Sequence, residues 1–191
     1  MPCGILIYDM QAARGTSLSP GNDHGPTYRT YRGLFAVVAI LALALDQVTK
    51  VIAAERLQGR ASIELIPNVL SLTFLRNSGA AFSAGAGFTL VLSLVAIGVS
   101  VAVIRMAARL RDRWWAIGLG LLLAGALGNL VDRIFREPAP LKGHVVDFID
   151  YGGFFVGNVA DIALTLAAVV IIWRTSRGVA IDGSRESREE S

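Results

Sequence analysis

The sequence predicts a mainly α-helical, polytopic membrane protein with four transmembrane helices and a small β-sheet between the first two. Hydrophobic residues make up 53% of the 191 residues, which is above the range of an ordinary soluble domain. The apolar residues are gathered into four long runs, and the charged residues cluster between these runs. This alternation is typical of a polytopic membrane protein.

Membrane topology accounts for the formal net charge of +3, so no nucleic-acid partner is expected. If both termini are cytoplasmic, eleven basic residues lie on the inner side and seven on the outer side. Because Lys and Arg are enriched in cytoplasmic loops, this is the predicted orientation. The inner set includes the compact run Arg105, Arg109, Arg111 and Arg113.

The first membrane helix is predicted over residues 33–54. We interpret the polar residues 1–32, which contain several Gly and Pro, as a disordered cytoplasmic tail. Near the end of the helix, Asp46 and Lys50 are i,i+4 neighbours and can form an ion pair. The pair either contributes to a functional site or is a purely structural salt bridge at the interface. The segment also has features of a cleavable signal peptide. A retained helix is simpler, because helical sequence continues past the A-x-A pattern of Ala42-Leu43-Ala44 and three more spans follow.

Residues 55–84 are predicted to form a small extracytoplasmic sheet on the membrane surface. Leu70 to Phe74 alternate with period two, as a half-buried strand does. The segment leads to Asn77 and Gly79, in a run of small residues that allows a partner or substrate to approach the backbone. A flexible loop tip is the alternative interpretation.

Three further spans are predicted: one over residues 85–104, one that begins at Trp114-Trp115, and one over residues 154–173. The tryptophan pair is typical of a membrane interface. Small residues recur every fourth position in the third span and favour close helix packing. These small residues are Gly120, Ala124 and Gly128.

The four predicted spans together place the membrane domain at residues 33–174. We interpret residues 175–191 as a disordered cytoplasmic tail.

The strongly polar residues near the spans all fall at one depth, close to the extracytoplasmic surface. At about 1.5 Å per residue, Asp46 lies in the outer third of the first helix, level with the end of the third and the start of the fourth. A channel or proton relay would spread polar groups across the membrane, whereas a single layer indicates a reaction site at the interface. The layer comprises Asp46, Asn77, Asn129, Asp132, Arg133, Asp147, Asn158 and Asp161.

Two of these carboxylates, Asp147 and Asp161, lie on either side of a Gly152-Gly153 turn. Carboxylates a few ångströms apart share one proton, so one can take a proton from water while the other polarises a carbonyl. Spacing alone does not select this pair, because Asp132 and Asp150 are rival carboxylates and structural pairing is a further alternative.

No metal or other cofactor is expected. The chain has a single cysteine, Cys3, and its two histidines, His24 and His144, are far apart. No H-E-x-x-H motif is present, so a zinc protease is not indicated.

Five short segments carry a family resemblance: Asp46-Gln47 with Lys50, Asn77 to Phe82, Gly125 to Arg133, Gly143 to Phe148, and Asn158 to Asp161. In this order they resemble lipoprotein signal peptidase (signal peptidase II), the membrane aspartyl protease family of bacteria, over residues 33–174. Each segment is weak alone, but five in order on four spans are specific. Two positions depart from the family pattern: Ala124 replaces a frequent glycine, and Gly157 stands where phenylalanine is frequent.

The resemblance implies an intramembrane aspartyl endopeptidase of the bacterial cytoplasmic (inner) membrane, with Asp147 and Asp161 as the catalytic pair. Its partners would be the phospholipid bilayer and prolipoproteins already lipidated on the lipobox cysteine, which are cut on the amino side of that diacylglyceryl-modified residue. A monomer is expected. The residues expected to bind substrate or support the site are Asp46, Lys50, Asn77, Gly79, Asn129, Asp132, Arg133 and Asn158.

The alternative class is a non-enzymatic membrane protein, such as a small transporter or an assembly module, in which the polar layer binds an ion or a partner. A transporter should tolerate an Asp-to-Glu change more often than a protease does, and it should yield no cleaved product.

Overall fold

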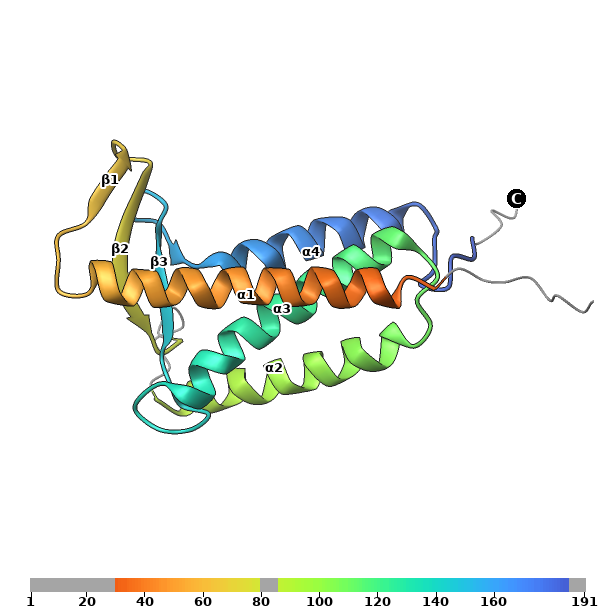
Figure 1. The fold of residues 1–191 in the computed structure, drawn as a ribbon, viewed down its shortest axis with the longest axis horizontal. Coiled ribbons are helices and arrows are strands. Elements are labelled where there is room, and N and C mark those ends of the chain that lie inside the picture. The colour runs from red at the N-terminus through yellow and green to blue at the C-terminus, as the bar shows by residue number, and fades with distance from the viewer. Residues whose placement is uncertain (1–29, 80–85, 186–191) are drawn as a thin grey trace, which may run out of the picture.

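The computed structural model describes residues 30–79 and 86–185, which form a four-helix bundle with a β-sheet at one end (Figure 1). All four helices are long and apolar enough to cross a membrane. The helices are α1 (Arg32–Leu57), α2 (Ala86–Ala107), α3 (Arg113–Phe135) and α4 (Val159–Ser176). The strands are β1 (Ile63–Ile66), β2 (Leu70–Asn77), β3 (Val145–Asp150) and β4 (Val156–Gly157).

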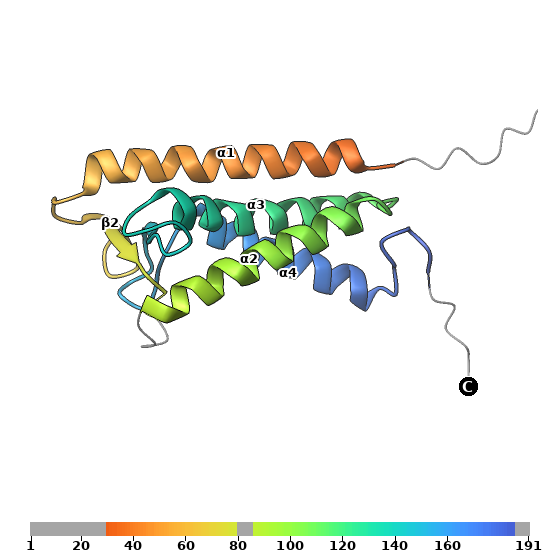
Figure 2. The same ribbon diagram turned by 90° about the horizontal axis from the view of Figure 1, so that it is seen from below.

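Helix α3 is the centre of the bundle, and α1, α2 and α4 pack around it (Figures 1 and 2). Its glycines let two neighbours approach closely. A Cβ atom on Gly120 would lie 2.9 Å from the backbone oxygen of Phe35 in α1, and one on Gly125 would lie 2.7 Å from the backbone oxygen of Ala160 in α4. The predicted close packing is therefore confirmed at Gly120, and Gly125 adds a second face that the prediction did not include.

The sheet is antiparallel, with strand order β1-β2-β3-β4. The prediction placed it wholly between α1 and α2, which is wrong for half of the strands, because β3 and β4 come from the segment between α3 and α4. Strand β3 also attaches the sheet to the bundle, since Val146 and Phe148 pack against Ala53 and Leu57 of α1. We call this end of the molecule the sheet end.

Helix α4 begins at Val159, later than the predicted start at residue 154. A capping box sets this boundary: the side chain of Asn158 accepts a hydrogen bond from the Asp161 N–H, and the side chain of Asp161 accepts one from the Asn158 N–H. The residues just before the cap are extended, because β4 pairs with the end of β3.

The other end of the bundle, which we call the arginine end, is closed by polar contacts. Asp112 caps α3 by accepting hydrogen bonds from the N–H groups of Trp114 and Trp115, and its Oδ2 lies 2.6 Å from Nη2 of Arg174. Arg32, the first residue of α1, donates from Nη2 to the backbone oxygen of Ala108 after α2.

The chain after α4 folds back onto the arginine end. Trp115 Nε1 donates to the backbone oxygen of the buried Val179 at 2.8 Å, and the Arg111 N–H donates to Ile181 O at 3.1 Å. The disordered tail predicted for residues 175–191 is thus not observed over residues 175–185, because an indole donor and a backbone donor hold them. Residues 186–191 lie outside the described residues, as does the predicted N-terminal tail up to residue 29.

Replacing Gly128 by alanine is expected to lower stability, because its Cβ atom would lie 2.5 Å from Oδ2 of Asp46. Overpacking of this kind typically costs about 1–3 kcal/mol. The measurement is the thermal unfolding midpoint of purified protein in detergent. Gly98, an exposed glycine in α2, is the control because no atom beyond the neighbouring backbone of its own helix lies within 4 Å of its Cβ position. Gly98→Ala should leave the midpoint unchanged or raise it; equal midpoints for the two variants would refute the close α1–α3 contact.

Candidate active site

Asp147 is a carboxylate held between two asparagine amides. It lies in β3 and is 1% exposed. Asn77, at the end of β2, donates from Nδ2 to Oδ2 of Asp147 at 2.8 Å, and Asn158, just before α4, donates from Nδ2 to Oδ1 at 2.6 Å. Asn77 and Asp147 lie on paired strands, where Leu75 opposes Asp147 and Asn77 opposes Val145.

Asp161 reaches the same place from the first turn of α4. Its Oδ2 accepts a hydrogen bond from the Asn158 N–H at 3.0 Å, and its own N–H donates to Asn158 Oδ1 at 3.1 Å. Its Oδ1 accepts a hydrogen bond from Asn129 Nδ2 at 3.2 Å. Asn158 therefore makes hydrogen bonds to both Asp147 and Asp161, so one residue joins the two carboxylates.

Burial raises the pKa of the Asp147 carboxyl to about 6. The hydrogen bonds from Asn77 and Asn158 act in the opposite direction, since they stabilise the ionised form, and the negative charge of Asp161 raises the pKa further. Asp147 thus keeps its proton to a higher pH than an ordinary aspartate does.

Asp150, one of the rival carboxylates, lies in a different environment. Side chains alternate between the two faces of a strand, so Asp150 and Asp147 point to opposite faces of β3. Asp150 accepts hydrogen bonds from Ser71 Oγ at 3.2 Å and from the Gly153 N–H at 2.8 Å. The structure therefore separates Asp150 from Asp161 and brings Asp147 and Asp161 together.

Lys50 forms a buried ionic cluster beneath the aspartate pair. Its Nζ lies 2.9 Å from Oδ2 of Asp46 and 2.9 Å from Oδ2 of Asp132, and the lysine is fully buried. The predicted Asp46–Lys50 ion pair is confirmed, but it lies in the protein interior. Lys50 also donates to Asn129 Oδ1 at 3.0 Å, which connects the cluster to Asp161 through the Asn129 amide.

The two carboxylates of the cluster extend it to other elements. Asp46 Oδ1 accepts a hydrogen bond from the Ala160 N–H in α4 at 2.8 Å. Asp132 accepts from the Val146 N–H in β3 at 3.2 Å and from Arg136 Nε at 2.6 Å. Asp132, the other rival carboxylate, is thus fully occupied as a structural anion that joins α1, α3 and β3.

Arg133 contributes a cation with a spare donor. It is buried, and its Nη1 forms no hydrogen bond with any residue that the structure describes. Asp147, Asp132 and Asp161 are all close enough to interact with it electrostatically. The cation thus lies within electrostatic reach of the aspartate pair, and its Nη1 group is available as a donor.

Gly79 has a specific conformational role next to Asn77. Its φ is +91°, which favours glycine, and its N–H donates to Asn77 Oδ1 at 2.8 Å. This bond turns the amide nitrogen of Asn77 toward Asp147. Residues 80–82 of the same sequence motif lie outside the described residues.

An apolar cavity of about 320 Å³ opens beside Asp161. The aromatic rings of Tyr151 and Phe155 stack with centroids 6.2 Å apart and form part of its lining. Gly157 makes room for one ring, because a Cβ atom there would lie 2.6 Å from Phe155 Cε1. Sequence reasoning missed these aromatics, although their position around the Gly-Gly turn was a usable signal. Ile162, Thr165 and Leu166 of α4 complete the lining.

This combination of fold and site belongs to a recognisable class. Within residues 30–79 and 86–185, no three His, Cys, Asp or Glu side chains are grouped so as to hold a metal ion. Two carboxylates joined by one asparagine, a buried cation and an adjoining apolar cavity lie together at one end of four membrane-length helices. Such a site suits acid–base chemistry at a membrane surface, and it defines a multi-pass membrane enzyme.

Comparisons with known proteins identify the family. The model described as signal peptidase (SPase) II matches residues 38–177. The lipoprotein signal peptidase of Rhodococcus jostii (strain RHA1) is 44% identical, over 86% of this chain and 83% of that protein. That of Mycobacterium avium (strain 104) is 46% identical over 90% and 97%. A solved structure described as a bacterial membrane enzyme is 32% identical, covers 78% of this chain and 96% of its own, and superposes with a TM-score of 0.68.

The chain therefore belongs to the signal peptidase II family, and it is a membrane protease. A second solved bacterial membrane enzyme agrees in fold, with 30% identity over 86% of this chain and 98% of its own, and a TM-score of 0.70.

Replacing Lys50 by methionine should strongly destabilise the bundle. The change leaves Asp46 and Asp132 buried without their shared cation, and breaking a buried pair costs about 3–5 kcal/mol. The measurement is the unfolding midpoint, together with the yield of folded protein. The control is Arg76→Met, which breaks the exposed 3.3 Å Arg76–Glu137 pair and should cost under about 1 kcal/mol.

If Lys50→Met gives too little folded protein to measure, the double variant Lys50→Met, Asp132→Asn should recover part of the yield, because it removes one of the unpaired charges. Equal stability of Lys50→Met and Arg76→Met would show that the cluster does not hold the bundle.

Stability should fall as the pH rises from about 4 to about 6, through the raised pKa of Asp147. The folded-state pKa of about 6 exceeds the ordinary value of 3.8, so the fold binds the proton more tightly than the unfolded chain does. Protonated Asp147 therefore adds about 3 kcal/mol to the free energy of unfolding. This contribution is fully present below pH 3.8 and is lost above pH 6. Unfolding midpoints from pH 4 to 7 should decline in the native protein and in Asp150→Asn but not in Asp147→Asn. Parallel profiles for the native protein and Asp147→Asn would contradict the assignment.

Proposed function

We propose that this protease removes signal peptides from lipidated prolipoproteins, cutting on the amino side of the diacylglyceryl-modified cysteine. The names of its relatives support the substrate class. The physical setting supports it as well, because acyl chains of such a substrate lie in the bilayer while its scissile bond lies near the surface. A polar site at the end of an apolar bundle, next to an apolar cavity, accommodates both parts.

Asp147 and Asp161 are proposed as the catalytic pair. The observation that carries this proposal is Asn158, which donates to Asp147 at 2.6 Å and binds Asp161 through two further hydrogen bonds. An asparagine that joins two carboxylates keeps them at a fixed separation, where they can share a proton.

We give the shared proton to Asp147, a choice that its raised pKa supports, and the role of base to Asp161. Asp161 accepts a proton from water while the water oxygen attacks the carbonyl carbon of the scissile peptide, and Asp147 gives its proton to the carbonyl oxygen. As the C–N bond breaks, the cysteine nitrogen takes a proton from Asp161 and Asp147 regains its own. The pair is then ready for another turnover.

The residues around the pair have supporting roles in this proposal. Arg133 offers its spare Nη1 donor to a substrate carbonyl, where it would stabilise developing negative charge. Asn77 and Asn129 orient one aspartate each. Asp46, Lys50 and Asp132 fix the helices that carry these groups, and Gly79 orients Asn77.

The proposed topology has both termini in the cytoplasm and the sheet end at the extracytoplasmic surface. It is supported by the excess of arginines at the other end of the bundle. A non-enzymatic transporter is disfavoured, because the buried ionic cluster and the aspartate pair gather at one end instead of crossing the membrane.

Asp147→Asn and Asp161→Asn should each reduce cleavage by about 10² to 10⁴-fold, because asparagine cannot exchange a proton with water or substrate. The assay is turnover of a lipidated prolipoprotein by purified protein in detergent, with substrate and product separated on a gel and with matched amounts of folded enzyme. The double variant should be hardly worse than either single one, since the two groups act as one unit.

Asp150→Asn is the matched control. It lies in the same strand as Asp147 but on the other face, and it should keep most of the activity. An active Asp147→Asn enzyme beside an inactive Asp150→Asn enzyme would mean that the wrong carboxylate has been chosen.

A further inference from the structure

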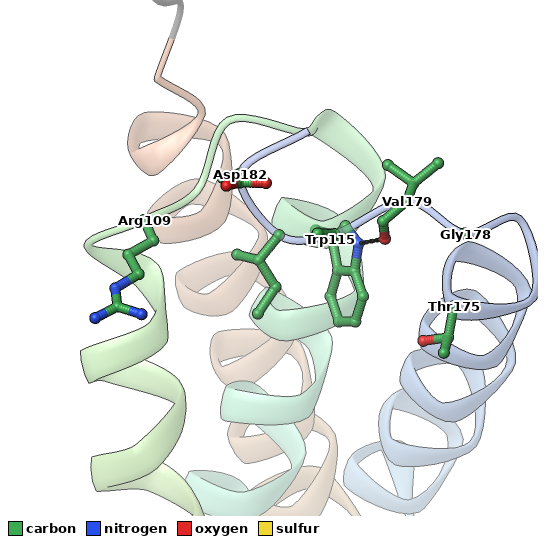
Figure 3. A pocket seen from close by; sticks show the side chains of 8 residues that line it. Arg109, Trp115, Thr175, Gly178, Val179 and Asp182 are labelled. Carbon is green, nitrogen blue, oxygen red and sulfur yellow. Dashed lines mark hydrogen bonds between the residues drawn. The ribbon is translucent and has the colours of Figure 1, made fainter. Parts of the chain in front are cut away.

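A second cavity, of about 460 Å³, lies at the arginine end of the bundle, far from the aspartate pair (Figure 3). Trp115 comes from the start of α3 and Thr175 from the end of α4, and Arg109 lies in the turn just after α2. The segment after α4 closes it with Val179 and Ile181. The walls are mostly apolar, and Figure 3 shows Arg109 at one edge.

An adjoining cavity of about 230 Å³ extends this space along α2. The two share Arg109 and Ile181, and the smaller one adds Arg105 and Met106. Because they adjoin at these two residues, we treat the two cavities together as one recess with apolar walls and two arginines on its rim. We call it the arginine recess.

Among the residues that the structure describes, some of the charged side chains around the arginine recess have a partner of opposite charge, and others do not. Arg174 is neutralised by Asp112 at 2.6 Å. Arg105 and Arg109, in contrast, make no side-chain hydrogen bond or ion pair with any residue in the described part of the chain. Asp182 also lines the recess; hydrogen bonds from the Ser184 hydroxyl and N–H orient its carboxylate, and its negative charge interacts with Arg111. The recess therefore combines apolar walls with two available guanidinium groups.

The recess lies at the end of the bundle that carries a pair of tryptophans. Trp114 and Trp173 stand edge to face at the same end of the bundle, with centroids 5.3 Å apart. Tryptophan is enriched at the membrane–water interface. Arginines at a membrane–water interface can pair with lipid phosphates, and apolar walls beside them can take an acyl chain.

We propose that the arginine recess binds one anionic phospholipid, with its phosphate against Arg105 and Arg109 and an acyl chain on the apolar walls. Charge complementarity favours an anion over a basic peptide. The apolar walls favour an amphiphile over a free anion, which would leave them without a partner. A bound lipid would contact α2, α3, α4 and the segment after α4 at once, so it should stabilise the bundle.

The test is a titration of the purified full-length chain in detergent with phosphatidylglycerol or with phosphatidylcholine of the same acyl chains, followed by thermal unfolding. Phosphatidylglycerol should raise the midpoint saturably, and phosphatidylcholine should not. Arg105→Gln, Arg109→Gln should weaken the apparent affinity by on the order of tenfold or more, at about 1 kcal/mol per arginine. Thr175→Trp, which fills the recess and keeps both arginines, should also weaken it.

The matched control is Arg56→Gln, Arg60→Gln, which removes two exposed arginines from the sheet end and has the same net charge as the Arg105→Gln, Arg109→Gln variant. It should keep the native affinity. Three results would each overturn the proposal: an equal midpoint shift with both lipids, an equal loss in the control variant, or the full shift with inorganic phosphate alone. If Thr175→Trp binds phosphatidylglycerol with native affinity, the acyl chain does not occupy the recess, and the proposal is likewise rejected in favour of nonspecific electrostatic binding to the surface.

Discussion

A single buried ammonium group organises the polar end of this protein. Lys50 carries its charge into the interior of a membrane bundle, where an ion loses several kcal/mol of solvation. That loss is offset only because Nζ lies 2.9 Å from Asp46 and 2.9 Å from Asp132. The carboxylates in turn accept backbone N–H groups, at Ala160 in α4 and Val146 in β3. The helices and the strand that carry the candidate catalytic residues are thus held to one cation.

Hydrogen bonds to their side-chain oxygens set the direction of the asparagine side chains around the aspartate pair. An amide has an acceptor side and a donor side, so a donor that occupies its oxygen leaves its NH2 group to face the other way. All three asparagines at the pair have such a donor, and all three turn their NH2 groups toward a carboxylate. The oxygen–donor pairs are Asn77 with the Gly79 N–H, Asn129 with Lys50 Nζ, and Asn158 with the Asp161 N–H.

Much of this arrangement was predictable from the sequence, and the exceptions have physical causes. Length and hydropathy predict four helices, and the i,i+4 spacing of Asp46 and Lys50 predicts their ion pair. The pairing of β2 with β3 joins residues about 70 positions apart, so no local pattern contains it. The full burial of Lys50 depends on Asp132 in another helix, which the spacing within α1 does not show. The ordered segment around Val179 was missed for the same reason, since an indole of α3 holds it.

Under the proposed function, the cavity beside Asp161 has a consequence for the rate at which the enzyme encounters its substrates. Two of its lining residues, Ile162 and Leu166, are 39% and 49% exposed on α4, so the cavity opens sideways to the lipid and not only toward the water. Molecules that share the membrane with the enzyme then reach it by diffusion in two dimensions. Their encounter rate is governed by the number of substrate molecules per unit area of membrane, and in a detergent solution by the number per micelle, instead of by the concentration in the bulk volume.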